Sequence, residues 1–245
     1  MNVLEVQGLA KRYPAFTLNG VSFAVPEGAV MGFIGRNGAG KSTTLKSILG
    51  MVHPDAGEVK VFGMDYAANE RAIRRELGVV LGGIDFYPKK KIRVITDVTR
   101  RFYDNWDEDK YRHYLRLFAI DEEKRVDQLS SGMKVKYMIA IALSHNARLL
   151  ILDEPTSGLD PVSRDELTEL LRRLVADGAR SVLFSTHITS DLEKCATHIA
   201  FIKDGELQYT GSLDDFRTHY KDVGATLEDI IVHVERRPLD ESAII

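Results

Sequence analysis

The first segment of this sequence whose residue types suggest a reactive or binding site is rich in glycine and ends in lysine and serine. Residues 35–42 read GRNGAGKS and match the phosphate-binding P-loop pattern at every specified position. Glycines let successive backbone N–H groups turn inward around phosphate oxygens, and a helix that follows adds its positive N-terminus. Lys41 is expected to reach the β- and γ-phosphates, and the Ser42 hydroxyl is expected to bind Mg²⁺. The segment therefore predicts a nucleoside triphosphate site made of Gly35, Arg36, Asn37, Gly38, Ala39, Gly40, Lys41, Ser42 and Thr43.

Two adjacent carboxylates supply a second group of reactive side chains. Residues 149–154 read LLILDE, which is typical of a buried strand that ends in acidic residues. Asp153 is expected at the carboxyl end of that strand, where P-loop enzymes hold Mg²⁺. Glu154 is a candidate for polarising or deprotonating an attacking water. Such a strand is common by itself, but its position downstream of the glycine-rich segment and before Pro155 makes the assignment specific.

These side chains can act together only if a sheet carries them, and the surrounding sequence predicts a parallel one. The apolar run 29–34 is typical of a strand buried on both faces. Residues 42–49 favour a helix that ends at Gly50. This order of strand, turn and helix begins an α/β unit. Residues 149–152 and 181–185 predict two further buried strands.

The rest of the sequence predicts elements of other kinds around this sheet. Residues 3–6 and 18–25 favour strands of a hairpin or meander, whereas residues 87–146 read as helical. Apolar residues after Gly132 follow a helical period. The remaining predicted elements are a helix from Asp160 to Gly178, a hairpin over residues 199–209 and an amphipathic helix over residues 226–237.

Composition excludes several classes of protein. The 245 residues are 44% hydrophobic and 28% charged, as in globular domains, and the formal net charge of −3 argues against nucleic-acid binding. No apolar run approaches the roughly 18–20 residues that span a bilayer, and no secretory leader is apparent. Cys195 is alone, so an internal disulfide is excluded. Any role at a membrane is therefore expected to depend on a partner.

Further motifs resemble one known family. Residues 129–133, LSSGM, resemble the LSGGQ signature of ATP-binding cassette (ABC) ATPases. Residues 157–160, SGLD, look like the D-loop of that family, and residues 185–187, STH, look like its switch-histidine segment. Tyr13 stands where the family places an aromatic ring that stacks on adenine.

The resemblance covers residues 1–216 and implies a fold and its division. The fold would be α/β, with a P-loop NTPase (RecA-like) core, an N-terminal antiparallel β-subdomain and an inserted α-helical subdomain. The core with its β-subdomain is expected over residues 1–86 and 147–216, and the helical signature subdomain over residues 87–146. Residues 217–245 are expected to form a C-terminal helical extension.

The run over residues 185–193 is most similar to the ATP-binding subunits of bacterial multidrug, antibiotic or acetoin-operon exporters. The resemblance implies an ATPase that converts ATP and water to ADP and phosphate, with Mg²⁺ held by Ser42 and Asp153. The protein would power a separate integral membrane subunit from the cytoplasmic, inner face of the cell membrane. No nucleic-acid partner is expected.

The resemblance also implies head-to-tail pairing with a second ATP-binding subunit, either a copy of this chain or a different cassette. Ser130 and Gly132 of one subunit would contact the γ-phosphate of ATP bound to the other. His187 would hydrogen-bond that phosphate and orient the water together with Glu154. Lys41, Glu154 and His187 are thus the expected catalytic residues.

Two departures from the family pattern bear on this expectation. Ser131 and Met133 replace the first glycine and the glutamine of the signature, which is expected to weaken closure of the dimer. The family's glutamine after the strand at residues 77–81 is replaced by residues 82–85, GGID. Either Asp85 or water would complete the metal shell. The glutamines of the chain lie elsewhere, at Gln7, Gln128 and Gln208.

Two other functions stay open at this point. One is a soluble ABC ATPase without a transport role, such as the iron–sulfur assembly type. The other is a regulatory subunit that binds ATP and barely hydrolyses it, which the missing glutamine motivates. Lys89 to Lys91 with Arg93 form either a solvated face or a contact with the partner or with lipid head groups. Cys195 is expected to be a small buried hydrophobic residue.

Overall fold

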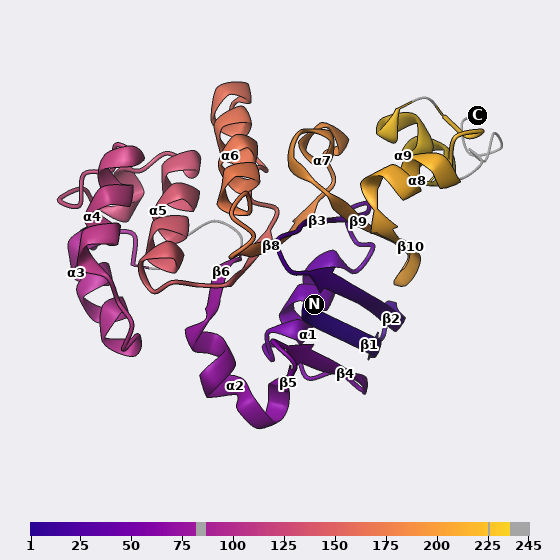
Figure 1. Cartoon of the computed structure of the whole chain (residues 1–245), viewed down its shortest axis with the longest axis horizontal. Coiled ribbons are helices and arrows are strands. Elements are labelled where there is room, and N and C mark those ends of the chain that lie inside the picture. The colour runs from indigo at the N-terminus through magenta and orange to yellow at the C-terminus, as the bar shows by residue number, and fades with distance from the viewer. Residues whose placement is uncertain (82–86, 225, 236–245) are drawn as a thin grey trace.

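Two β-sheets organise the chain in this computed structural model, which describes residues 1–81, 87–224 and 226–235 (Figure 1). The smaller sheet is antiparallel, with the strand order β2-β1-β4-β5, and the larger sheet has the order β10-β9-β3-β8-β7-β6. The larger sheet is parallel except for β10 at its edge. The strands are β1 (Asn2–Tyr13), β2 (Phe16–Pro26), β3 (Val30–Ile34), β4 (Ala56–Val61), β5 (Met64–Asp65), β6 (Leu77–Leu81), β7 (Leu149–Asp153), β8 (Ser181–Thr186), β9 (His198–Lys203) and β10 (Glu206–Ser212).

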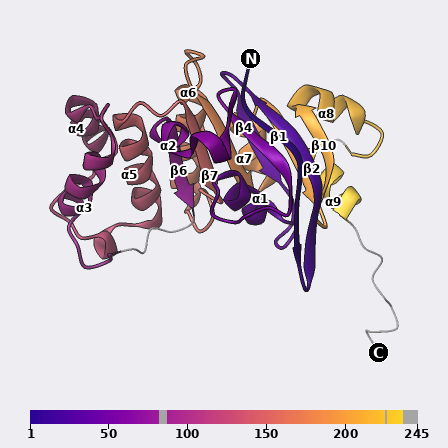
Figure 2. The ribbon, with the colours of Figure 1, turned by 90° about the horizontal axis from the view of Figure 1, so that it is seen from below.

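Helices cover the faces and one end of these sheets. Figure 2 shows β1, β2 and β4 side by side along one side of the molecule, with α8 and α9 beyond β10. The helices are α1 (Lys41–Ile48), α2 (Tyr66–Arg75), α3 (Ile92–Thr99), α4 (Glu108–Leu117), α5 (Ser131–Ser144), α6 (Pro161–Leu174), α7 (Thr189–Cys195), α8 (Leu213–His219) and α9 (Leu227–Glu235), with 3₁₀ turns η1 (Arg100–Phe102) and η2 (Val126–Gln128). Among the helices described here, none is long and apolar enough to cross a bilayer.

The central strands of the larger sheet are apolar because both of their faces are covered. Every residue of β3, β7 and β8 is buried. One core lies on the side of the smaller sheet and α1, and it includes Val6, Phe33 and Leu45. A second core on the other side includes Ile139 of α5 and Leu192 of α7. The predicted α/β fold is confirmed.

Helices α3, α4 and α5 gather at one end of the molecule and share a third core (Figure 1). The Thr96 hydroxyl in this core lies 2.9 Å from the Tyr111 hydroxyl and 2.8 Å from the Tyr137 hydroxyl, so the buried oxygens are hydrogen-bonded. Burial raises the pKa of Tyr137 to about 12. Helix α5 joins this group to the sheet because Ile139 and Leu143 belong to the second core.

Several elements differ from the expected boundaries. Strands β1 and β2 extend beyond residues 3–6 and 18–25 because their pairing continues to Tyr13 and Phe16. The sequence does not predict α2. Asp65 is the N-cap of this helix, and its side chain accepts a hydrogen bond from the Ala68 amide. The last helix begins at Leu227, and residues 236 and 237 of the predicted helix lie outside the described part of the chain.

Candidate active site

The glycine-rich segment forms the turn between β3 and α1, as the P-loop pattern predicts. Gly38 and Gly40 have φ values of 84° and 112°, in the region that favours glycine. A Cβ at Gly40 would lie 2.8 Å from the Phe16 ring, so a larger residue would also clash there. Gly40 is the N-cap of α1 and supplies no side-chain cap, which leaves first-turn N–H groups available to an anion.

Lys41 lies at the bottom of this turn with only 5% of its surface exposed. Its ammonium donates to the Gly35 carbonyl at 2.7 Å and to the Arg36 carbonyl at 3.2 Å. It also forms an ion pair of 3.1 Å with Glu154 Oε1. A buried ammonium needs such partners because an unpaired charge in the interior is costly.

Glu154 follows directly after β7 and connects Lys41 to His187. Its φ is 50°, and its amide donates to the Ser185 hydroxyl at 2.9 Å, which fixes the backbone against β8. Oε2 lies 2.8 Å from His187 Nδ1, while Oε1 contacts Lys41. The carboxylate therefore lies between the buried Lys41 ammonium and the imidazole that follows β8.

Asp153 is the last residue of β7 and is nearly buried. Its Oδ1 accepts a hydrogen bond of 2.5 Å from the Ser185 hydroxyl. Within the described residues no group of three or more histidine, cysteine or acidic side chains is arranged as a metal site. A hydroxyl from Ser42 and one carboxylate from Asp153 fit Mg²⁺, which keeps several waters and takes substrate phosphate oxygens as ligands.

A cavity of about 470 Å³ lies above these residues. The expected residues Asn37, Gly38, Gly40, Lys41, Ser42, Thr43, Glu154 and His187 line it together with Phe16 and Ser157. Phe16 and Ser157 are not among the expected site residues. Ser157 follows from the position of the D-loop beside Glu154, whereas Phe16 is recognisable only from its place at the end of the β1–β2 hairpin.

Tyr13 does not line this cavity, although it was expected at the adenine. It pairs with Phe16 across the hairpin, is 38% exposed and has the Lys11 ammonium 6.0 Å from its ring centroid. From the same hairpin, Phe16 lines the cavity and its ring approaches Gly40.

Ser130 and Gly132 also do not line the cavity of their own chain. Ser130 caps α5, and its hydroxyl accepts a hydrogen bond of 3.2 Å from the Met133 amide. Gly132 is buried against Ser163 and Leu159, next to the segment that follows Glu154. The N-terminus of α5 is therefore not part of the site that a single chain builds around Lys41.

Other residues considered from the sequence have structural partners. Lys89 pairs with Asp127, and both Lys91 and Arg93 pair with Glu123. Cys195 is buried, as expected, and burial raises its pKa to about 12. Asp85, the proposed substitute for the missing glutamine, lies outside the described residues, as do all of residues 82–86.

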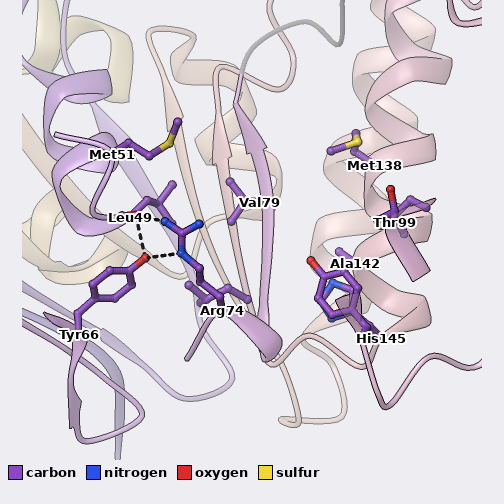
Figure 3. Close-up of a pocket in the computed structure, with 12 residues that line it drawn as sticks. Leu49, Met51, Tyr66, Arg74, Val79, Thr99, Met138, Ala142 and His145 are labelled. Carbon is purple, nitrogen blue, oxygen red and sulfur yellow. Dashed lines mark hydrogen bonds between the residues drawn. The ribbon is translucent and has the colours of Figure 1, made fainter. Parts of the chain in front are cut away.

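A second cavity, of about 290 Å³, lies between α2 and the helices α3 and α5 (Figure 3). On one side, Arg74 donates to the Tyr66 hydroxyl and to the Leu49 carbonyl, both at 3.3 Å. On the other side, the His145 ring stacks on Tyr103 with centroids 3.8 Å apart. Burial lowers the pKa of His145 to about 4, although its Nδ1 lies 3.2 Å from the Arg75 carbonyl oxygen.

An adjoining cavity of about 510 Å³ shares Arg74 and Tyr103 with the second cavity. It is rich in arginine because Arg71, Arg75 and Arg101 also line it. Arg74 and Arg75 have acidic partners in Glu70 and Asp104, whereas Arg71 and Arg101 form no ion pair with another described residue. We call these two cavities together the α2–α5 groove.

Known proteins resemble this chain along most of its length. The family model described as ABC transporter matches residues 18–157. The bacitracin transport ATP-binding protein BcrA of Bacillus licheniformis is 32% identical over 208 residues, which is 84% of this chain and 68% of that protein. The Nod factor export ATP-binding protein I of Burkholderia orbicola (strain AU 1054) is 36% identical over 208 residues, which is 82% of this chain and 68% of that protein.

A solved structure agrees with these matches. The ATP-binding subunit of an ABC transporter superposes with a TM-score of 0.84 at 30% sequence identity, over 96% of this chain and 100% of the other. The glycine-rich turn, the buried Lys41 and the Glu154–His187 pair lie on the same kind of scaffold. This chain therefore belongs to the ABC transporter family, as an ATP-binding and ATP-hydrolysing cassette.

Proposed function

We propose that this protein hydrolyses ATP at the cavity around Lys41, with Glu154 and His187 acting on the attacking water, and that hydrolysis powers an exporter. The observation that carries the proposal is the position of the Glu154 carboxylate between Lys41 Nζ at 3.1 Å and His187 Nδ1 at 2.8 Å. A base next to the phosphate-binding lysine is what water attack on a phosphoryl group requires.

The phosphates would bind to the amides of residues 38–43 and to Lys41. Lys41 then exchanges the Glu154 carboxylate for phosphate oxygens, because the triphosphate supplies the negative charge that the buried ammonium needs. Glu154, no longer held by Lys41, accepts a proton from water while His187 orients the same water or the γ-phosphate. The pair is already in hydrogen-bond contact, so little reorganisation is needed.

Mg²⁺ would be held by the Ser42 hydroxyl and by Asp153. When bound, the ion neutralises charge that develops on the phosphate oxygens. Ser185 orients Asp153 through a 2.5 Å hydrogen bond and thereby limits the rotation of the carboxylate. Residues 82–86 are not assigned a role at the metal.

The site needs a second subunit to be complete. Ser130 and Gly132 lie outside the cavity of their own chain, at the N-terminus of a helix of fourteen residues that can bind an anion. In a head-to-tail pair, this N-terminus would approach the γ-phosphate bound to the other subunit. Tyr13 or Phe16, at the end of the hairpin, would stack on adenine from the same chain as Lys41.

The α2–α5 groove is the surface we assign to a membrane-spanning partner. It joins apolar and aromatic residues to a cluster of arginines, two of them without an acidic partner among the described residues. Phe102, which lines the arginine-rich cavity, is 71% exposed, and this suits an anchor at an interface. The two named relatives are export or antibiotic-transport proteins, so we assign export to this chain and a peripheral position on the cytoplasmic face of the membrane.

ATP hydrolysis by the purified chain with Glu154→Gln tests the proposal. The variant keeps the size of the side chain and removes its basicity, so kcat should fall by about 10²–10⁴ while ATP binding is retained. Glu58→Gln, on an exposed position of β4, is the matched control and should hydrolyse ATP as the wild type does. Wild-type turnover by Glu154→Gln would overturn the role of Glu154, and absence of turnover in the wild type with and without a membrane partner would favour the regulatory alternative.

A further inference from the structure

Asp191 is a buried carboxylate to which the mechanism proposed above gives no role. It lies in the first turn of α7, four residues after His187, and its side chain is 0% exposed. Within the described residues, neither carboxylate oxygen has a hydrogen-bond partner. Burial raises the pKa of this carboxyl, and the neighbouring Thr156 hydroxyl lowers it. A buried carboxylate without a hydrogen bond is costly, so its presence needs a reason other than filling space.

Two polar groups from other segments face this carboxylate. Arg164 of α6 places its Nε 4.0 Å from Asp191 Oδ1. The Thr156 hydroxyl lies close enough to affect the carboxyl without closing a hydrogen bond of ordinary geometry. Thr156 Oγ1 and Arg164 Nε are themselves buried and without hydrogen-bond partners in the part of the chain described. We call Thr156, Arg164 and Asp191 the buried polar cluster.

The buried polar cluster includes one residue from each of the two segments that carry the proposed catalytic pair. Thr156 follows Glu154 by two residues, and Asp191 follows His187 by four. The N-cap of helix α7 is Ile188, which supplies no side-chain cap, so the start of the helix is not fixed by capping. The Glu154 amide donates to the Ser185 hydroxyl, and the two side chains themselves touch only through the 2.8 Å interaction of Glu154 with His187. A second connection behind this contact would fix the distance between the two side chains.

Attachment of α7 to α6 does not by itself require a buried charge. Lys194 of α7 and Asp165 of α6 already form an exposed ion pair of 2.5 Å. Leu167 and Leu171 of α6 belong to the same apolar core as Leu192 of α7. Because these contacts hold the helices together, the carboxylate of Asp191 is available to orient polar groups rather than to supply packing.

We propose that Asp191 is a positioning residue for ATP hydrolysis, which through Thr156 and Arg164 fixes the segment carrying Glu154 relative to His187. The inference rests on the catalytic roles proposed for Glu154 and His187. The proposed role concerns the chemical step and not ATP binding. Thr156, Arg164 and Asp191 do not line the cavity in which residues 38–43 would bind the phosphates. Loss of the connection should therefore lower kcat and leave the KM for ATP unchanged.

Asp191→Asn tests this because the amide has the shape of the carboxyl and lacks its charge. We expect kcat to fall about tenfold or more, the range typical of losing an outer partner of a site residue. Thermal unfolding should occur at nearly the same temperature, because loss of the long 4.0 Å contact with Arg164 is offset by removal of a buried charge that has no hydrogen-bond partner. Lower activity without lower stability is the combination that a purely structural role would not produce.

Thr156→Val and Asp165→Asn complete the experiment. Thr156→Val replaces the hydroxyl with a methyl group and decides the question if Asp191→Asn does not fold. We expect this variant to show the same fall in kcat as Asp191→Asn and the KM of the wild type. In the double variant the two losses should not add, since both variants break one connection. Asp165→Asn breaks the exposed ion pair between the same two helices and should behave as the wild type.

Three results would overturn the inference. These are wild-type kcat in both Asp191→Asn and Thr156→Val, a fall in kcat that follows a fall in unfolding temperature, and fully additive losses in the double variant. Wild-type protein and Glu154→Gln are assayed beside them. Failure of the proposed function appears as turnover that Glu154→Gln does not lower, whereas failure of this inference leaves that difference intact.

Discussion

At the scale of single residues, the charged groups of the proposed site are paired with one another. In our proposal, the bound triphosphate would take over part of this pairing. Lys41 contacts two backbone carbonyls and the Glu154 carboxylate, and Glu154 in turn contacts His187. The same three side chains would meet the triphosphate and the water in our proposal. The resting contacts therefore hold the groups near the positions in which they would act.

His145 gives a residue-scale prediction about pH. Burial lowers its pKa from 6.5 to about 4, so the unfolded chain binds a proton more readily than the folded chain between these values. Stability is therefore lost as the pH falls from about 6.5 toward 4, by about 2 kcal/mol at pH 5. Urea unfolding at about pH 7.5 and pH 5 should reveal this loss.

His145→Gln should remove that part of the pH dependence, even if the variant is less stable at neutral pH through loss of the Tyr103 stacking. His113→Gln is the control because His113 is exposed on α4. This variant should show the same pH dependence of unfolding as the wild type. An equal dependence of unfolding on pH in the wild type and in His145→Gln would refute the assignment.

The positions of site residues that belong to a sequence pattern could be predicted from the sequence, whereas those of isolated side chains could not. Lys41 and Ser42 follow from the glycine spacing, and Glu154 follows from the end of an apolar strand, because these patterns require a particular local backbone. Phe16 enters the cavity only through the geometry of the hairpin. Asp191 carries no pattern of its own, since an acidic residue in the first turn of a helix is ordinary.

At the scale of elements, the turn between β9 and β10 supports the phosphate-binding loop. The Gly205 amide donates to the Ala39 carbonyl at 3.0 Å, and the Gly205 carbonyl accepts from the Asn19 amide at 2.9 Å. Its φ is 83°, and a Cβ there would lie 1.9 Å from the Thr17 carbonyl oxygen. The turn thus connects the larger sheet, the smaller sheet and the phosphate-binding loop.

Gly205→Ala should therefore destabilise the protein by about 3 kcal/mol or more, since left-handed strain and a backbone clash combine. It should also weaken ATP binding by displacing Ala39. Gly63→Ala is the matched control, because Gly63 has a φ of 76° and open space around its Cβ position, so only about 1 kcal/mol is expected. Thermal unfolding and calorimetric ATP titration measure the two effects, and equal losses in both variants would contradict this role of the turn.

Element types were predictable from periodicity, but strand order was not. The buried strands at residues 149–152 and 181–185 follow from uninterrupted apolar runs. That β3 lies between β8 and β9, far from it in sequence, is decided by packing over the whole sheet. Helix α2 was missed because charged residues dominate it and only Tyr66 and Ile73 are buried.

At the scale of the whole molecule, our proposal places halves of two different sites on one chain. The half with Lys41, Glu154 and His187 lines a cavity, and the half with Ser130 and Gly132 lies at the start of α5 outside it. In a head-to-tail dimer, the Lys41 half of each copy would face the Ser130 and Gly132 half of the other copy. Such a dimer is closed and would hold two equivalent sites. Activity per chain should then rise with protein concentration.

The most direct measurement is ATP hydrolysis by a mixture of Lys41→Ala and Ser130→Arg chains. Each variant alone should be inactive, because each damages one half of every composite site. In an equal mixture, half of the dimers are mixed and hold one intact site, so about a quarter of wild-type activity should return. If the wild type hydrolyses ATP and the mixture stays as inactive as its components, the site is not built from two copies of this chain.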